Sequence, residues 1–132
     1  MTIFFDERIL LAMMTESILV VDDNQTTRDI LRTILLSAGY KAVDTSEDGT
    51  AAIDAIKTKR YDTFIVDYRM PSMRGDELTR ILRKNQPDAF IIGYSIESKE
   101  ETFRSAGANA FLVKDDLMQR IVPLIQGRFQ IF

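Results

Sequence analysis

The stretch that decides the fold is Ser17-Ile-Leu-Val-Val-Asp-Asp-Asn24, a short apolar, β-branched run that stops at two acidic residues. Such a run, bounded by polar residues, is typical of a strand buried inside a parallel sheet. Residues 25–38 follow with apolar side chains at helical spacing, and Gly39 stands where a glycine commonly ends a helix. The pattern therefore predicts a strand, a short connection that carries carboxylates, and then a helix.

The same alternation continues through the rest of the chain. We expect further strands at 40–44, 63–66, 89–94 and 108–113, and further helices at 48–59, 76–85, 97–105 and 116–126. Strands that alternate with helices at this spacing predict the α/β class, in which right-handed crossovers place helices on both faces of a parallel sheet. The pattern alone leaves the order of the strands open.

Composition excludes several kinds of chemistry. The chain has 132 residues, a net charge of −3, no histidine and no cysteine. It therefore has no disulfide, no histidine or cysteine zinc site, no Ser–His–Asp triad and no cysteine nucleophile. The charge is too mild to indicate nucleic-acid binding. The apolar runs are too short to cross a membrane, and charged residues at 6–8 interrupt any secretory signal, so we expect a cytoplasmic protein.

The pattern predicts one domain over residues 17–126, with an extra segment at each end. Residues 1–16 are either an appended helix or a mis-assigned start, and the tail 127–132 alternates apolar and polar residues as a strand does. If the first segment is a helix, it carries an apolar stripe of Phe4, Phe5, Ile9, Leu10 and Met13. We expect such a stripe to pack on its own domain or on a second copy in a homodimer rather than on a membrane.

Polar side chains stand at the predicted strand ends: Asp22, Asp23, Asp67, Ser95 and Lys114. Each of these residues alone could simply face water at the end of its strand. The carboxyl ends of parallel strands, however, meet at one edge of a sheet, where ligands bind. Three carboxylates at that edge would raise one another's pKa unless a cation neutralised them. Oxygen donors without histidine or cysteine favour Mg²⁺ or Mn²⁺ over zinc. The sequence therefore predicts a divalent-cation site.

Four ordered motifs carry a resemblance to a known family. They are Ile18-Leu-Val-Val-Asp-Asp-Asn24, Phe64-Ile-Val-Asp-Tyr-Arg-Met-Pro-Ser-Met-Arg-Gly75, Ile91-Ile-Gly-Tyr-Ser95 and Gly107-Ala-Asn-Ala-Phe-Leu-Val-Lys114. With these motifs at these separations, residues 17–126 resemble the response regulator receiver domain, the phosphoacceptor module of bacterial two-component signalling. The resemblance implies a doubly wound, flavodoxin-like fold with five helices and strand order 2-1-3-4-5.

The resemblance also implies a role for each site residue. Asp67 would accept a phosphoryl group from the phosphohistidine of a sensor histidine kinase or a phosphotransfer protein. Asp23 and Asp67 would bind Mg²⁺ directly, Asp22 through water, and Arg69 through its backbone carbonyl. Lys114 would pair with Asp67 before transfer and with the phosphoryl group afterwards. Such a chain catalyses its own phosphorylation and slow dephosphorylation, but acts mainly as a signalling switch.

Two further residues match the family's switch. Ser95 would donate a hydrogen bond to the new phosphoryl group, and Phe111 stands where the family has its switch aromatic. The signal would pass to a downstream protein target as a shift between two loop arrangements. Gly75 and Pro71 are expected to shape the loop after the acceptor through their backbones.

Two positions depart from the family pattern. Ile96 replaces the very small residue that usually follows the switch hydroxyl, and its bulk predicts slow autodephosphorylation because it obstructs the attacking water. Asp115 replaces the proline that usually follows the lysine, and we expect it to cap the last helix or to compete for the ammonium of Lys114. Arg69 is expected either to hold phosphate at the pocket or to face solvent.

Other functions remain open on sequence alone. A degenerate receiver would bind proteins without being phosphorylated. A phosphatase with an aspartyl-phosphate intermediate would need a second acid two residues after its nucleophile, where this chain has Arg69. Flavin binding would need a hydroxyl-rich phosphate loop after the first strand, where this chain has acids. The sequence also leaves open the kinase, the target, and whether the domain ends or relays a signal.

Overall fold

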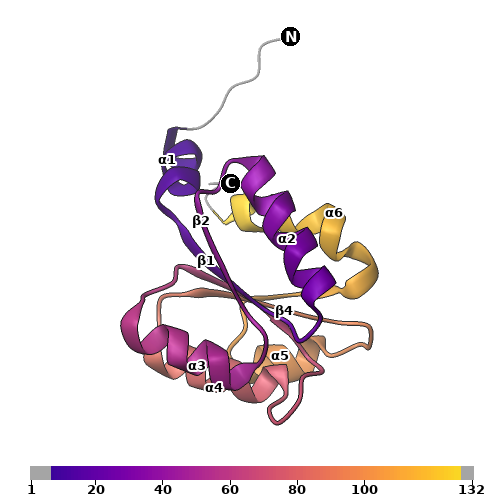
Figure 1. Cartoon of the computed structure of the whole chain (residues 1–132). Helices are drawn as coiled ribbons and strands as arrows, with labels where there is room; N and C mark the ends of the chain where they lie inside the picture. The colour runs from indigo at the N-terminus through magenta and orange to yellow at the C-terminus, as the bar shows by residue number, and fades with distance from the viewer. Residues whose placement is uncertain (1–6, 129–132) are drawn as a thin grey trace.

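A computed structural model describes residues 7–128 and shows a parallel sheet with helices on both faces (Figure 1). The strands are β1 (Ser17–Val21), β2 (Ala42–Ser46), β3 (Thr63–Asp67), β4 (Phe90–Ser95) and β5 (Ala110–Val113). The helices are α1 (Glu7–Thr15), α2 (Gln25–Ala38), α3 (Gly49–Thr58), α4 (Gly75–Asn85), α5 (Glu100–Ala106) and α6 (Lys114–Gly127). The order β2-β1-β3-β4-β5 confirms the predicted doubly wound fold.

The structure differs from the prediction in the number of helices and in several element boundaries. The described residues form six helices rather than five, because α1 occupies the amino-terminal extension. The second strand begins at Ala42 rather than at residue 40, because Gly39 adopts a left-handed φ of 117° and the Tyr40 N–H still bonds back to Leu35 of α2. The last helix begins at Lys114 rather than at residue 116.

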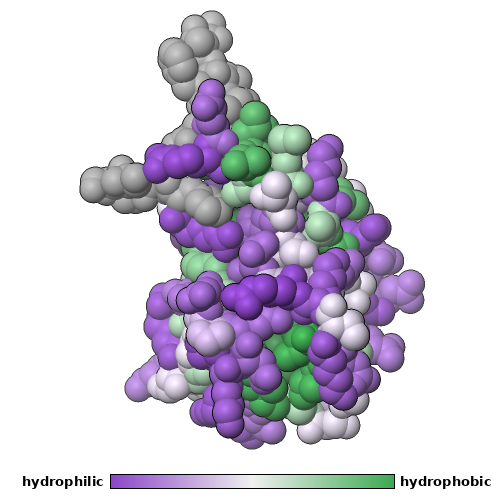
Figure 2. All heavy atoms as spheres, turned by 90° about the vertical axis from the view of Figure 1, so that its left-hand side faces the viewer, coloured by the Kyte–Doolittle hydropathy of each residue, from purple (hydrophilic) through white to green (hydrophobic). Residues whose placement is uncertain are grey.

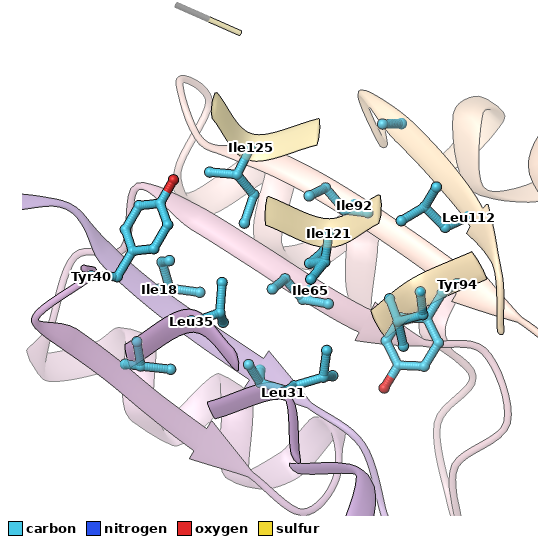
Figure 3. Packing of buried hydrophobic residues seen from close by; sticks show 14 of the residues in the cluster. Ile18, Leu31, Leu35, Tyr40, Ile65, Ile92, Tyr94, Leu112, Ile121 and Ile125 are labelled. Carbon is cyan, nitrogen blue, oxygen red and sulfur yellow. The ribbon is translucent and has the colours of Figure 1, made fainter. Parts of the chain in front are cut away.

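Each face of the sheet has its own apolar cluster. On one face, α2 and α6 pack over residues such as Ile18, Ile65 and Ile92 (Figure 3). On the other, α3, α4 and α5 pack over residues such as Phe64 and Ile91. Because both faces are covered, the strands are apolar nearly throughout, which explains why their sequences show runs rather than alternation.

The helix that follows β1 begins at a side-chain cap. Asn24 has extended backbone angles, and its side-chain oxygen accepts a hydrogen bond from the Thr27 N–H at 2.9 Å. The two residues between Val21 and Asn24 are therefore held in a short, fixed connection at the carboxyl end of the strand. That connection contains Asp22 and Asp23.

The amino-terminal helix α1 packs against the far end of the same domain. Met13 is buried and Ile9 contacts the cluster under α2 and α6, whereas Leu10 is 48% exposed. The predicted apolar stripe is thus only partly covered by the domain, and Phe4 and Phe5 lie outside the described residues. Figure 2 shows hydrophobic side chains toward the upper end of the molecule, where α1 lies in Figure 1.

The residue that follows α1 contacts the carboxyl-terminal end of the described chain. The buried Glu16 accepts a hydrogen bond from the Thr63 hydroxyl and forms an ion pair with Arg128. Within the predicted tail, Gly127 ends α6, and residues 129–132, where we expected a strand, lie outside the described residues. Among residues 7–128, no helix has the length and apolar character needed to cross a membrane.

Candidate functional site

Three carboxylates meet at the carboxyl edge of the sheet. Asp22 and Asp23 follow β1, and Asp67 ends the neighbouring strand β3, in which Val66 is aligned with Val21 of β1. One side-chain oxygen from each acid lies within 4.8 Å of the others. The predicted convergence of the three acids is therefore present in the structure.

Asp22 is fully buried and held by three hydrogen bonds. Its Oδ1 accepts from the Asn24 N–H at 2.8 Å, its Oδ2 accepts from the Tyr94 hydroxyl, and its backbone carbonyl accepts from Arg28 at 2.8 Å. Hydrogen bonds to both carboxylate oxygens fix the orientation of the group. Asp23, in contrast, is exposed to solvent.

Asp67 is buried, and its surroundings disfavour its negative charge. Burial is the main cause that raises the pKa of its carboxyl group from an ordinary 3.8 to about 7, followed by the charge of Asp22. The Lys114 ammonium acts in the opposite direction, and Asp23 raises the pKa further. The site therefore carries an excess of negative charge that a bound cation would relieve.

A cleft of about 330 Å³ opens above these acids. It is lined by Asp23, Asn24, Asp67, Arg69, Ser95, Ile96 and Lys114. Four of the five predicted strand-end residues thus line one cleft. The fifth, Asp22, is fully buried and lies next to the two acids that line it.

Ser95 and Lys114 reach the cleft from different elements. Ser95 ends β4, is buried, and its Oγ accepts a hydrogen bond from the Glu97 N–H at 3.1 Å. Lys114 is the first residue of α6. Within residues 7–128, no ion pair or hydrogen bond joins Lys114 to Asp67, so the predicted direct pair is not formed in this structure, although the ammonium lowers the pKa of Asp67.

The predicted helix cap at Asp115 is wrong. Because α6 begins at Lys114, Val113 occupies the N-cap position, and no side chain accepts a capping hydrogen bond there. Asp115 lies instead in the first turn, where its negative charge interacts favourably with the positive end of the helix dipole. No ion pair links Asp115 to Lys114 in the described part of the chain, so the expected competition for the ammonium is also absent.

Arg69 and Ile96 lie at the mouth of the cleft. The Arg69 side chain is 74% exposed and forms an ion pair with Glu97. It also lines a second cleft of about 360 Å³, together with Lys99 and Tyr68. Ile96 is 79% exposed, which is unusual for a large apolar side chain and leaves it over the opening.

The remaining predicted residues, Phe111, Gly75 and Pro71, do not line this cleft, although Pro71 lines the second one. Phe111 is half-buried on β5, and its ring lies 5.8 Å from that of Phe103. Gly75 begins α4, and its N–H donates to the Tyr68 carbonyl at 2.8 Å, which ties the loop to the end of β3. Pro71 lies in this loop and is exposed. A switching motion of Phe111 stays a prediction.

Sequence reasoning missed Tyr94 and Glu97. Tyr94 reads as one more apolar residue of its strand, although a buried tyrosine hydroxyl generally needs a hydrogen-bond partner, and that need was the available signal. Glu97 reads as the start of a helix that in fact begins at Glu100. Its pairing with Arg69, 28 residues away in sequence, depends on the tertiary fold.

The residues present fit a hard divalent cation. Three carboxylate oxygens stand close together, two of the acids are buried, and the charge of Asp67 is incompletely balanced. Mg²⁺ in proteins is commonly held by one or two carboxylates together with water and substrate phosphate. The partly open cleft leaves room for such ligands.

Comparison with known proteins gives a consistent assignment. Residues 18–126 match the family model described as the response regulator receiver domain. The polar-differentiation response regulator DivK of Brucella ovis is 25% identical over 119 residues, which cover 86% of this chain and 96% of that protein. The family match spans nearly all of the sheet and the helices α2 to α6, and leaves out α1.

Solved structures show the same fold. The chemotaxis response regulator CheY4 of Vibrio cholerae aligns with a TM-score of 0.78 at 28% identity, covering 85% of this chain and 97% of that one. The response regulator TrrA of Thermotoga maritima was solved in complex with Mg²⁺ and BeF. It aligns with a TM-score of 0.73 at 33% identity, covering 83% of this chain and 99% of that one.

Proposed function

The chain belongs to the response regulator receiver domain family, and we propose that Asp67 is its phosphoacceptor in a two-component system. Receiver domains partner with histidine kinases, so the phosphoryl donor is a phosphohistidine on a sensor kinase or on a phosphotransfer protein. The single observation that carries the proposal is the meeting of Asp22, Asp23 and Asp67 under one cleft that Ser95 and Lys114 also line.

The transfer exchanges one bond to phosphorus for another. A carboxylate oxygen of Asp67 attacks the phosphorus atom and forms a P–O bond, while the P–N bond to histidine breaks and its electron pair returns to the ring nitrogen. Once a cation at the site offsets the effect of burial, Asp67 is ionised, and no proton then has to leave it during the attack. The chemistry therefore needs positioning and charge neutralisation more than proton transfer.

Mg²⁺ or Mn²⁺ would be held by Asp23 and Asp67, by Asp22 through water, and by the Arg69 carbonyl. When bound, the ion supplies positive charge next to the oxygens of the transferring phosphoryl group. Lys114 supplies a second positive charge from the head of α6, and in the phosphorylated state it pairs with a phosphoryl oxygen. The metal ion and the Lys114 ammonium together offset the negative charge of Asp67, which burial disfavours.

Ser95 links phosphorylation to conformation. Its Oγ now accepts from the Glu97 N–H, and its own proton is free to turn toward a phosphoryl oxygen on Asp67. A serine that moves inward draws Ile96 and the following loop with it, and Phe111 on the adjacent β5 follows into the space vacated. A downstream protein reads this change, and we expect the exchange to take place in the cytoplasm.

Phosphoryl transfer from candidate histidine kinases tests the proposal. Wild-type protein with Mg²⁺ should acquire label, Asp67→Asn should acquire none, and the exposed Asp88→Asn should behave as wild type. Chelation of the metal should abolish labelling of the wild type. Label on the Asp67→Asn variant would mean that the acceptor is elsewhere.

Beryllofluoride separates this function from phosphorylation-independent binding. With Mg²⁺, it should give a saturable change in tyrosine fluorescence in the wild type and no change in Asp67→Asn. If the wild type neither binds beryllofluoride nor takes label, the chain is a degenerate receiver that only docks partners.

A further inference from the structure

A tyrosine hydroxyl forms part of the floor of the acidic site. Tyr94 lies on β4 and is fully buried, and its hydroxyl donates a hydrogen bond to Oδ2 of Asp22. Asp22 follows β1, and β3 lies between β1 and β4 in the sheet. The Tyr94 side chain thus reaches past β3, whose Asp67 is its direct cross-strand partner, to contact the acid on the far side.

This contact completes the fixation of the Asp22 carboxylate. The Asn24 N–H holds Oδ1 from within the β1–α2 connection, and Tyr94 holds Oδ2 from a different strand. A buried carboxylate with a donor on each oxygen is restricted to one orientation. The orientation is therefore set jointly by a local turn and by a long-range contact over 72 residues of sequence.

We propose that Tyr94 is a positioning residue for the divalent-cation site, which holds Asp22 in the orientation that the ion and its bound water require. This inference rests on the metal site of the proposed function. Groups that hydrogen-bond to metal-binding carboxylates fix their direction, and their removal typically weakens metal binding tenfold or more. Tyr94 reaches the ion only through Asp22, so it has no catalytic contact of its own.

A second buried tyrosine, Tyr40, allows a positioning role of the Tyr94 hydroxyl to be distinguished from a role in packing alone. Tyr40 is also buried in the cluster under α2 and α6, but its hydroxyl has no hydrogen-bond partner among the described residues. Figure 3 shows the two rings at opposite ends of this cluster. Packing in this core therefore does not depend on a bonded hydroxyl, and the Tyr94 hydroxyl is distinguished by its acceptor, Asp22.

The test is Mg²⁺ binding measured by calorimetry without any phosphoryl donor, on wild type, Tyr94→Phe and Tyr40→Phe. Tyr94→Phe should raise the Kd for Mg²⁺ about tenfold. Tyr40→Phe loses the same atom from the same core and should bind as the wild type does. Equal or tighter binding by Tyr94→Phe would overturn the inference, whereas absence of binding by the wild type would overturn the proposed function itself.

A measurement on the wild-type hydroxyl covers the case in which Tyr94→Phe does not fold. The chain has four tyrosines and no tryptophan, so tyrosine labelled with ¹³C at Cζ gives a simple spectrum. Phenylalanine variants of Tyr40, Tyr61 and Tyr68 assign three resonances, and the fourth belongs to Tyr94. Mg²⁺ should shift the Tyr94 resonance and leave that of Tyr40 in place, and a Tyr94 resonance that does not move would contradict the proposal.

Discussion

Gly75 lies so close to the main chain of Asp67 that a Cβ atom on Gly75 would stand 2.1 Å from the Asp67 carbonyl oxygen. The same Cβ would meet the Phe103 ring at 2.9 Å. The first residue of α4 is thus packed directly against the last residue of β3, which carries the proposed acceptor. Only a residue without a side chain allows this approach.

Gly75→Ala should therefore destabilise the fold by about 2 to 3 kcal/mol, because backbone atoms must shift to relieve the overlap. Denaturant unfolding followed by circular dichroism measures the change. Gly127→Ala is the matched control, since nothing lies within 4 Å of a Cβ there. A glycine-to-alanine change in a helix raises the free energy of unfolding by about 0.5 to 1 kcal/mol. Equal effects of the two substitutions would contradict the close approach at Gly75.

The raised pKa of Asp67 predicts a dependence of stability on pH. Without metal, the folded state keeps the proton up to about pH 7, whereas the unfolded chain loses it near pH 4. Stability should therefore fall as pH rises from 4 to 7 and stay low above that range. Asp67→Asn should remove this loss and unfold with a free energy about 2 to 4 kcal/mol higher than wild type at pH 8.

Saturating Mg²⁺ should restore much of the lost stability of the wild type at pH 8 and change Asp67→Asn less, because a ligand stabilises the state that binds it. At pH 4 the two proteins should unfold alike. The surface substitution Asp88→Asn controls for the charge change, and a comparable gain in that variant would show that the effect is not local to the acid cluster.

The exposed position of Ile96 predicts a long-lived phosphoryl group. Its side chain lines the cleft and is 79% exposed, and we expect it to obstruct the water molecule that would attack the phosphorus atom. Ile96→Ala should shorten the half-life of the phosphorylated protein by about three- to tenfold, which is at most 1.4 kcal/mol in barrier height. Loss of label over time measures it. Ile30→Ala removes another exposed isoleucine, which is 43% exposed on α2 and does not line the cleft, and should leave the half-life unchanged.

Much of this fold could be predicted from the sequence because local and global signals agree. The apolar runs of β1, β3 and β4 and the glycine at position 39 each specify one structure. The acid cluster was predictable as well, since Asp22, Asp23 and Asp67 stand at strand ends and parallel strands end at one edge.

The finer contacts of the site could not be predicted, because they depend on where side chains turn. The Tyr94 hydroxyl reaches Asp22 across an intervening strand, and nothing local to either residue signals the contact. Because α6 begins at Lys114, Asp115 lies in the first turn rather than at the cap, and the local sequence pattern does not fix the exact end of a helix.

The ion pair between Arg69 and Glu97 predicts opposite effects of its two members on an anionic phosphoryl donor. The pair lies at the mouth of the cleft and is largely exposed, so it should contribute less than about 1 kcal/mol to stability. Its charges nevertheless act on a negatively charged small molecule such as acetyl phosphate on its way to Asp67. Glu97→Gln should therefore speed phosphorylation by acetyl phosphate, and Arg69→Ala should slow it.

Both effects should be about two- to fivefold at low salt and should shrink at 0.5 M salt, where charges are screened over a few ångströms. Glu100→Gln breaks a similar exposed pair with Arg104 in α5, away from the cleft, and should leave the rate unchanged. A rate that responds to Glu100→Gln as strongly as to Glu97→Gln would mean that net charge alone governs the donor. A rate that responds only at the Arg69–Glu97 pair would place the effect at the entrance through which the donor must pass to reach Asp67.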